Sequence, residues 1–325
     1  MNSVDAMAIE IEYQLEVLTK LELPRQAAVN NCVIIGSGDS YVAGLIAQHA
    51  SDYRVICCNP LDVVKNPKII TNRQIFIVSV SGNTNANILV AKIAKEKKVQ
   101  TTAITAKPKS KLAKNCDEII ELKFKSTNVP TAGTIAFTSS MLACLSLVRK
   151  VNGLPNLDSI FKQVNHEIEN SFSRNKKLLR YHSSSFILGS GILFPIALYG
   201  ALKINEVIGS KSLAYPLEEF FHSPVFSARA NDDIILLAGP QDKSDKKFKI
   251  TYEKLREINF STLLIDCSRE SVTDSLLKAI FFLQLFVLKQ AQKRGMKDCY
   301  FLRNKKLLRV SSDLIYRNYN KFYKY

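Results

Sequence analysis

The chain has 325 residues, of which 46% are hydrophobic and 23% are charged, and this balance is typical of a protein with two globular domains of ordinary size. No uncharged apolar run reaches the roughly 18 residues that a membrane-spanning helix needs, so we expect no membrane partner. The first residues carry Asp5, Glu10 and Glu12 without an apolar core, which is not typical of a secretory signal peptide and favours the cytoplasm.

The net charge of +16 favours anionic partners, either small phosphates or nucleic acid. The lysines are spread along the chain, however, and no sequence motif of a nucleic-acid-binding module is present. We therefore interpret the charge as a solvated basic surface and expect no nucleic-acid partner.

Seven cysteines and four histidines are too scattered to form the spacing of a zinc site, and no Cys-x-x-Cys pair occurs. We expect no metal and no cofactor, and we interpret the cysteines as buried free thiols in a reducing compartment.

Strand patterns alternate with helix patterns along the chain, which predicts parallel sheets covered by helices. In the first half, the expected strands cover 32–35, 55–58, 75–79, 101–105 and 118–122, and the expected helices cover 40–50, 85–97 and 134–151. In the second half, the expected strands cover 186–188, 234–237 and 261–265, and the expected helices cover 195–208, 246–258 and 272–293. We expect two α/β domains, 1–160 and 161–325, each with a parallel five-stranded sheet between helices, as in a flavodoxin-like sandwich.

The two halves resemble each other in the same order. Residues 35–38 match 188–191, the strand that ends at Ser79 matches the one that ends at Ala238, and residues 103–105 match 264–266, at offsets of 153, 159 and 161 residues. Offsets that drift so slowly predict a duplicated unit with small insertions.

Two loops of the first half predict a phosphate site. Residues 36–40 and 79–84 each join a strand to a helix, and they offer glycines and small hydroxyl side chains where the carboxyl ends of parallel strands meet. A third loop, 127–131, precedes the helix at 134–151. The alternative interpretation of the 79–84 loop is an ordinary helix cap on a flexible turn.

The corresponding loop of the second half, 238–242, has lost the serines and gained Asp242. A carboxylate repels phosphate, so we expect phosphate binding in the first domain only.

Residues 38–44, 79–84 and 197–206, together with 219–224, resemble the sugar isomerase (SIS) domain family, and most closely the isomerase half of glucosamine-6-phosphate synthases. The resemblance covers nearly the whole chain as two tandem SIS domains, without the glutaminase domain of those enzymes. It implies a phosphosugar isomerase or deaminase that acts on hexose-6-phosphates.

The resemblance also implies roles for individual residues. Glu206 matches the family's catalytic glutamate, Lys203 the lysine one turn before it, and His222 the histidine that assists ring opening, often from the neighbouring subunit of a dimer. Glu219, three residues before His222, can orient that histidine. The resemblance implies that Ser40, Ser79, Ser81 and Thr84 bind the phosphate, and the loops described above add Gly38 and Thr131 as phosphate-binding candidates.

Several features depart from the family pattern. Asp39, Val80 and Ser223 replace a threonine, a polar residue and a glycine, and the family's Schiff-base lysine is only approximated by Lys305 or Lys306. The alternative to these catalytic roles is a purely structural one. Lys203 and Glu206 would then form a surface ion pair, His222 would be a packed histidine, and the lysines of the tail would be solvated.

The leading hypothesis is the interconversion of glucosamine-6-phosphate and fructose-6-phosphate with free ammonia, in a homodimer. The alternatives are a phosphoglucose/phosphomannose isomerase, a fructosamine-6-phosphate deglycase, and a non-catalytic module that senses sugar phosphates.

Overall fold

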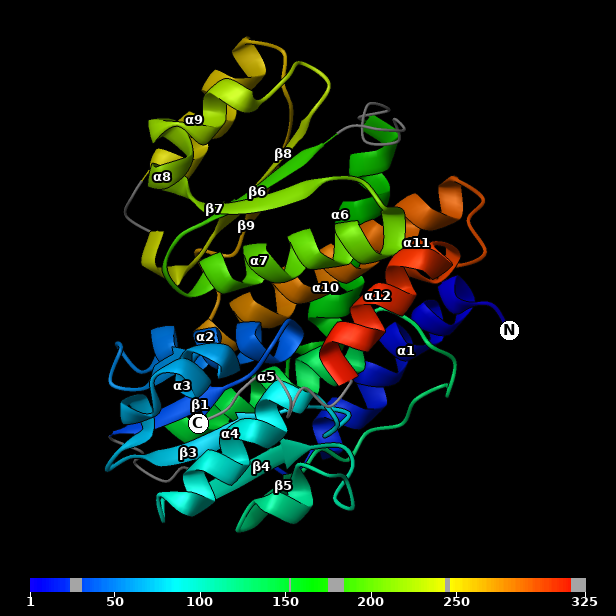
Figure 1. The fold of residues 1–325 in the computed structure, drawn as a ribbon. Coiled ribbons are helices and arrows are strands. Elements are labelled where there is room, and N and C mark those ends of the chain that lie inside the picture. Colours follow the sequence, from blue (N-terminus) through cyan, green and yellow to red (C-terminus); the bar gives the residue numbers. More distant parts are fainter. Residues whose placement is uncertain (24–30, 152, 175–183, 243–245, 317–325) are drawn as a thin grey trace. The chain divides into compact units, whose positions relative to one another are not determined.

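The computed structural model describes residues 1–23, 31–151, 153–174, 184–242 and 246–316, and these form two compact units (Figure 1). The first-sheet unit comprises residues 20–125, 135–152 and 304–325. The second-sheet unit comprises residues 1–19, 126–134 and 153–303.

The first-sheet unit has a parallel sheet of five strands in the order β2-β1-β3-β4-β5. The strands are β1 (Cys32–Ile35), β2 (Ile56–Cys58), β3 (Gln74–Val78), β4 (Thr101–Thr105) and β5 (Glu118–Glu121), and the helices are α2 (Asp39–Ala50), α3 (Pro60–Lys65), α4 (Asn85–Glu96), α5 (Ile135–Val148) and α12 (Lys305–Tyr316). The inner strands β1 and β4 are buried along their whole length, as expected of a parallel sheet with both faces covered. Helix α5 is apolar nearly all round because it is buried beside α2.

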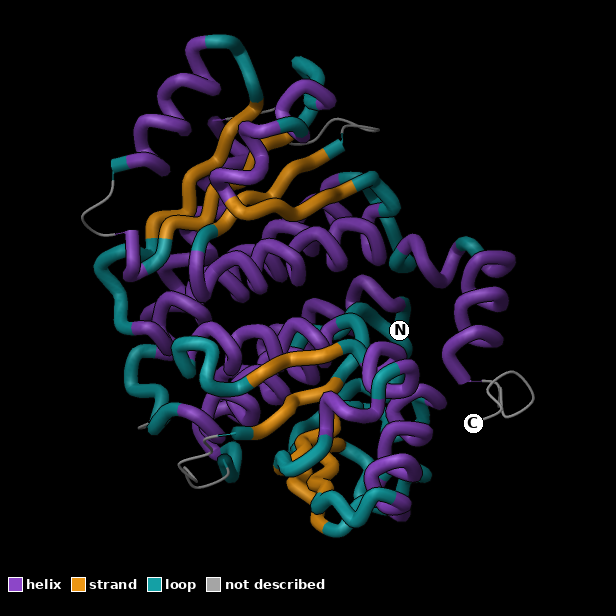
Figure 2. Tube along the Cα trace, turned by 60° about the vertical axis from the view of Figure 1, so that its left-hand side comes forward, coloured by secondary structure: helices purple, strands orange, loops and turns teal. Residues whose placement is uncertain are grey.

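The second-sheet unit has a parallel sheet of four strands in the order β7-β6-β8-β9. Its strands are β6 (Ser185–Gly189), β7 (Ser212–Pro216), β8 (Asp233–Ala238) and β9 (Ser261–Asp266), and its helices are α1 (Ser3–Val17), α6 (Leu157–Arg174), α7 (Phe194–Lys203), α8 (Leu217–His222), α9 (Lys247–Glu257), α10 (Val272–Lys293) and α11 (Tyr300–Arg303). Helices α8 and α9 cover one face of this sheet, and α6, α7 and α10 lie on the other (Figure 1). The trace in Figure 2 shows helices on both sides of each sheet, which confirms the predicted α/β fold.

The prediction of five strands in each sheet is corrected for the second sheet, where the described residues form four. In the first-sheet unit, β4 is followed by a loop that contains a 3-10 turn over Ala113–Asn115, and then by the edge strand β5, whose Glu-Ile-Ile-Glu residues are mostly exposed. In the second-sheet unit, β9 leads within a few residues into α10, whose first turn is capped by the Ser271 side chain accepting from the Asp274 N–H. The chain therefore continues as a helix where the first unit adds a strand. Strand β7 was missed because its Ser-Leu-Ala-Tyr-Pro sequence is only half-buried and lacks strict alternation.

Strand pairing in the two sheets supports the duplication. The pair Ile35–Ile77 of β1 and β3 becomes Leu188–Leu236 of β6 and β8 when the offsets of 153 and 159 residues are applied. The pair Val78–Ile104 becomes Leu237–Ile265 with the offsets of 159 and 161. Both sheets thus repeat one strand order and one register.

The stretch Gly191–Ile208 is apolar enough, and long enough at 18 residues, to cross a membrane, but 67% of it is buried inside the structure. It comprises α7 and the turns around it, and α7 packs against β6 and α10. Burial of this kind is typical of a core helix.

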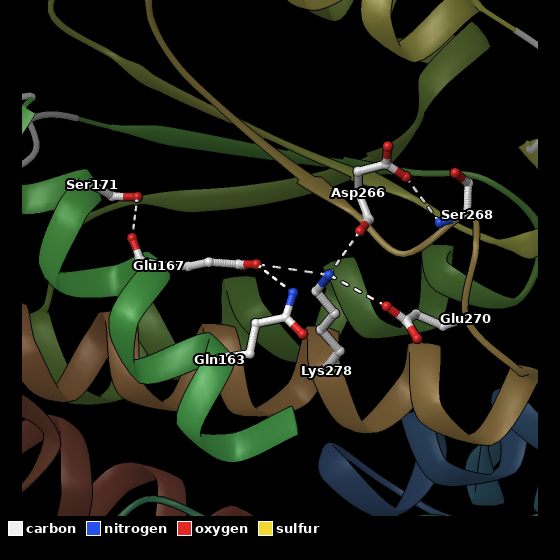
Figure 3. A network of polar contacts seen from close by, with 7 residues as sticks. All are labelled: Gln163, Glu167, Ser171, Asp266, Ser268, Glu270 and Lys278. Carbon is white, nitrogen blue, oxygen red and sulfur yellow. Dashed lines mark hydrogen bonds and ion pairs between the residues drawn. The ribbon is translucent and has the colours of Figure 1, made fainter. Parts of the chain in front are cut away.

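A buried lysine joins three elements of the second-sheet unit (Figure 3). Lys278 of α10 donates to the backbone oxygen of Asp266 at 3.0 Å, at the end of β9. Its ammonium also lies 3.8 Å from Glu167 of α6 and 3.6 Å from Glu270. Because the lysine side chain is only 7% exposed, its charge is balanced by these carboxylates rather than by water.

Candidate functional site

The first sheet presents two loops where its strand order reverses. Strands β1 and β3 are neighbours, and the chain leaves them toward different helices, α2 and α4. In open parallel sheets this is the position where ligands bind, at the carboxyl ends of the strands. The loops 36–38 and 79–84, both predicted as phosphate loops, follow these two strands.

The loop after β1 is narrow and depends on glycine. A Cβ at Gly36 would lie 2.7 Å from the backbone carbon of Ser40, and Gly38 has a φ of +57° that other residues rarely adopt. Ser40 is buried in the first turn of α2. The predicted residues Gly38 and Ser40 therefore lie at one turn, between a strand end and a helix start.

The loop after β3 is fixed by backbone hydrogen bonds. The Ser79 N–H donates to the Ile104 oxygen at 3.0 Å, and the Gly82 N–H donates to the Ser79 oxygen at 3.0 Å. Ser81 Oγ accepts from the Asn83 N–H at 3.3 Å. These bonds hold Ser79 and Ser81 in one tight turn beside the start of α4.

Thr84 occupies the N-cap position of α4, but its side chain makes no capping hydrogen bond. An ordinary helix cap would accept from an N–H of the first turn. The Thr84 hydroxyl therefore does not cap α4 in the way an ordinary N-cap side chain does, and phosphate binding by Thr84 stays a prediction.

The third predicted loop belongs to the other unit. Thr131 Oγ1 donates to the Ser3 oxygen of α1 at 2.9 Å, and Thr127 donates from both its N–H and its hydroxyl to Glu10 at 2.9 Å. The structure therefore gives these hydroxyls partners on α1, and phosphate binding by Thr131 stays a prediction.

Lys203 and Glu206 form an ion pair on an irregular turn. Helix α7 ends at Lys203, and the chain continues as a π-helical turn over Ile204–Ile208, although the sequence predicted one regular helix to 208. Lys203 Nζ lies 2.6 Å from Glu206 Oε2, and the two side chains are 1% and 38% exposed. A widened turn of this kind is frequent at functional sites. The Lys203 ammonium is thus buried and holds the Glu206 carboxylate, and the carboxylate remains accessible to solvent and to a ligand.

Tyr199 completes this arrangement, and the sequence analysis missed it. Its ring lies 5.2 Å from Lys203 Nζ, and its buried hydroxyl donates to the Gly133 oxygen at 2.8 Å and accepts from Gln284 at 2.9 Å. The signal was available, because Tyr199 precedes Lys203 by four residues and residues at that spacing share a helix face.

His222 lies at the end of α8 and is exposed. Its Nε2 is 3.6 Å from Glu218, and its side chain is 70% exposed. Glu218 also pairs with Lys247, and this contact lowers the pKa of Glu218. The structure therefore places Glu218, rather than the predicted Glu219, beside the imidazole. A role for Glu219 stays a prediction.

Lys305 and Lys306 begin α12, and both are exposed to solvent. A Schiff-base lysine requires desolvation or a neighbouring cation to become nucleophilic. In the part of the chain that the structure describes, both lysines remain in contact with water, so a Schiff-base role for either stays a prediction.

The seven cysteines are free thiols, and most of them are buried. Burial raises the pKa of Cys32, Cys144 and Cys267 to about 12, so these thiols stay protonated at neutral pH. A protonated thiol is a poor nucleophile. Cys32, Cys144 and Cys267 are therefore unsuited to nucleophilic chemistry.

Comparisons with known proteins agree with this architecture. Residues 61–150 match the family model described as "SIS domain". The glutamine–fructose-6-phosphate aminotransferase [isomerizing] of Escherichia coli (strain K12) is 27% identical over 252 residues, which cover 70% of this chain and 40% of that protein. The chain thus spans about two fifths of the length of such relatives.

Two solved structures share the fold over most of their length. The glucosamine-6-phosphate deaminase from Thermotoga maritima aligns with a TM-score of 0.69 at 18% identity, covering 91% of this chain and 93% of that one. The C-terminal domain of glucosamine-fructose-6-phosphate aminotransferase from Francisella tularensis aligns with a TM-score of 0.62 at 18% identity, covering 89% and 93%. At this identity the likeness concerns the fold.

Proposed function

We propose that this chain, which contains a SIS domain and is homologous to the isomerase domain of glutamine–fructose-6-phosphate aminotransferases, interconverts glucosamine-6-phosphate and fructose-6-phosphate with free ammonia. The observation that carries the proposal is the Lys203–Glu206 pair. It offers a carboxylate held by a buried ammonium and still 38% exposed, as a base that moves one proton requires.

The loops after β1 and β3 bind the phosphate of the substrate. Ser40, Ser79, Ser81 and Thr84 donate hydroxyl hydrogen bonds, and the N-terminal N–H groups of α4 contribute partial positive charge. These groups are small, so they surround a phosphate oxygen without filling the space that the sugar needs.

Glu206 moves the proton of the reaction. In the deaminating direction, His222 gives a proton to the ring oxygen and takes the proton that the C1 hydroxyl loses as the sugar opens to the aldehyde. Glu206 then takes the proton from C2 and returns it to C1, while one proton passes from the amino nitrogen to the carbonyl oxygen on C1. These transfers convert the amino aldehyde into a ketimine. Water adds to the ketimine, and ammonia leaves to give fructose-6-phosphate. Every atom is conserved, because one water enters and one ammonia departs.

The deciding experiment incubates the protein separately with glucosamine-6-phosphate, fructose-6-phosphate and mannose-6-phosphate, and measures ammonia and ketose. Ammonia released from glucosamine-6-phosphate alone supports the proposal. Ketose formed from mannose-6-phosphate without ammonia supports an isomerase of unmodified hexose phosphates instead. Binding without any product supports the sensing module.

Glu206→Gln tests the role of the base. The amide keeps the shape of the side chain and an oxygen for Lys203, but it cannot accept the substrate proton. We expect turnover to fall on the order of 10²–10⁴-fold, with sugar-phosphate affinity nearly unchanged in calorimetric titration. The matched control is Glu253→Gln, an exposed position on α9 that should keep full activity. Unchanged turnover in Glu206→Gln would defeat the mechanism.

A further inference from the structure

The second sheet repeats the loop that follows β1 of the first sheet. Gly189 corresponds to Gly36, and a Cβ at Gly189 would lie 2.7 Å from the Leu193 backbone, just as one at Gly36 would meet the Ser40 backbone at 2.7 Å. Two residues on, Gly191 has a φ of +47° where Gly38 has +57°. The residue between these glycines is Ser190, the equivalent of Ser37. The loop geometry is therefore the same in the two copies of the duplicated unit.

The loop that follows β8 differs, because it supplies a carboxylate. Asp242 lies in a short turn directly after this strand. Its Oδ1 accepts from the Ser190 hydroxyl at 2.7 Å, and its Oδ2 accepts from the Gly239 N–H at 2.8 Å. The carboxylate thus joins the two loops at the place where this sheet also reverses its strand order.

These two donors have counterparts in the first sheet. By the strand register, Ser190 corresponds to Ser37, and Gly239 corresponds to Val80 in the serine loop. Both carboxylate oxygens of Asp242 accept hydrogen bonds, one from each loop, as two oxygens of a phosphate would. The Asp242 carboxylate therefore does not only repel an anion. It also occupies the position between the two loops that a bound anion would take.

We propose that the strand ends of β6 and β8 form a second oxyanion site, which the chain fills with its own Asp242 carboxylate and which binds phosphate once that carboxylate is removed. The proposal rests on the proposed function only through the equivalence with the first sheet's loops. In the natural chain its consequence is that the second sheet cannot bind a phosphate, because the donors are already occupied.

The experiment measures the number of inorganic phosphate ions bound per chain by equilibrium dialysis, for the natural chain and three variants. Asp242→Ala removes the carboxylate and should bind one more phosphate than the natural chain. Asp242→Asn removes the charge but still fills the space, so it should bind the same number as the natural chain. Asp242→Ala combined with Ser190→Ala lacks one donor and should bind the added phosphate at least tenfold more weakly.

The variants separate occupancy from simple repulsion. If Asp242→Asn gained a phosphate as Asp242→Ala does, charge repulsion alone would explain the exclusion, and the proposal would be overturned. Equal stoichiometry in Asp242→Ala and the natural chain would overturn it as well. Should Asp242→Ala fail to fold, Asp242→Ser undergoes the same dialysis and is judged by the same criterion.

The design also keeps this proposal apart from the function proposed above. The number of phosphates bound by the natural chain reports on the first sheet's loops. The difference between Asp242→Ala and the natural chain reports on the second sheet alone. If the natural chain bound no phosphate and Asp242→Ala bound one, the phosphate site proposed in the first sheet would be contradicted, and the site proposed in the second sheet would be supported.

Discussion

Gly82 is the residue on which the serine loop depends most directly. Its φ is +61°, and a Cβ there would lie 2.0 Å from Ser110 Oγ and 2.4 Å from Ser110 Cβ. Ser110 cannot easily withdraw, because it is buried and its hydroxyl accepts from the Ala113 N–H at 3.3 Å. Glycine therefore serves two purposes at this position, since it permits the backbone conformation and leaves room for a neighbouring turn.

We predict that Gly82→Ala destabilises the first-sheet unit by about 2–5 kcal/mol, as the sum of left-handed backbone strain and overpacking. Gly38→Ala is the matched control, because Gly38 has a similar φ of +57° and nothing within 4 Å of the added Cβ. That variant should lose only about 1–3 kcal/mol, from backbone strain at φ +57° and ψ −128° without overpacking. Urea titration followed by circular dichroism gives both values, and equal losses in the two variants would contradict the steric argument.

The sequence predicted the residue types of this loop but not the reason for Gly82. The strand before it and the helix after it follow from periodicity, and the hydroxyls follow from composition. The contact with Ser110 joins residues 28 positions apart in the sequence, and no local pattern reports on it. For the same reason Glu219 was expected beside His222, although the structure places Glu218 there.

At the scale of elements, α10 is attached to α6 by two lysines in different surroundings. Lys278 pairs with Glu167 with its side chain 7% exposed, whereas Lys289 pairs with Glu169 with its side chain 27% exposed. The two pairs join the same helices, and only the depth of the lysine differs. The sequence predicted the helix over 272–293, which is α10, but it did not predict which of its lysines is internal.

We predict that Lys278→Met destabilises the second-sheet unit by about 1–3 kcal/mol, because it leaves Glu167 and Glu270 close together without a cation. The two glutamates are about one third exposed, so solvent screening holds the loss below that of a fully buried pair. Lys289→Met, the matched control, should cost less than about 1 kcal/mol. Thermal unfolding of both variants supplies the comparison, and a larger loss in Lys289→Met would contradict the assignment.

At the scale of the whole molecule, the duplication is visible from the sequence. The sequence does not show that the helices at the two ends of the chain belong to the opposite units. The order of matching segments predicted two similar units, and the strand registers agree with it. The division of the chain is more complex, because α1 belongs to the second-sheet unit and α12 to the first. The sequence analysis predicted no helix at α1, and no local pattern reports that this segment packs in the unit of the second sheet.

We predict that Ile11→Ala, in the buried face of α1, loosens the second-sheet unit at a cost of about 2–5 kcal/mol. Hydrogen exchange read by mass spectrometry should show faster exchange in α10, with β1 and β3 unchanged. Ile46→Ala, at an equally buried position of α2, should give the opposite pattern. Faster exchange of β1 in Ile11→Ala would contradict the assignment of α1.

The attachment of α1 affects how the chain emerges during synthesis. The Ser3 N–H donates to Asp298, and the Cys299 N–H donates to the Ser3 hydroxyl, across separations of 295 and 296 residues. At 5–20 residues per second, the ribosome delivers these partners roughly 15–60 s after it has made the helix. Until then Ser3 lacks these two hydrogen-bond partners, so α1 reaches its final place only after the segment around residue 298 has been made. A chaperone that binds short apolar helices would find a target there.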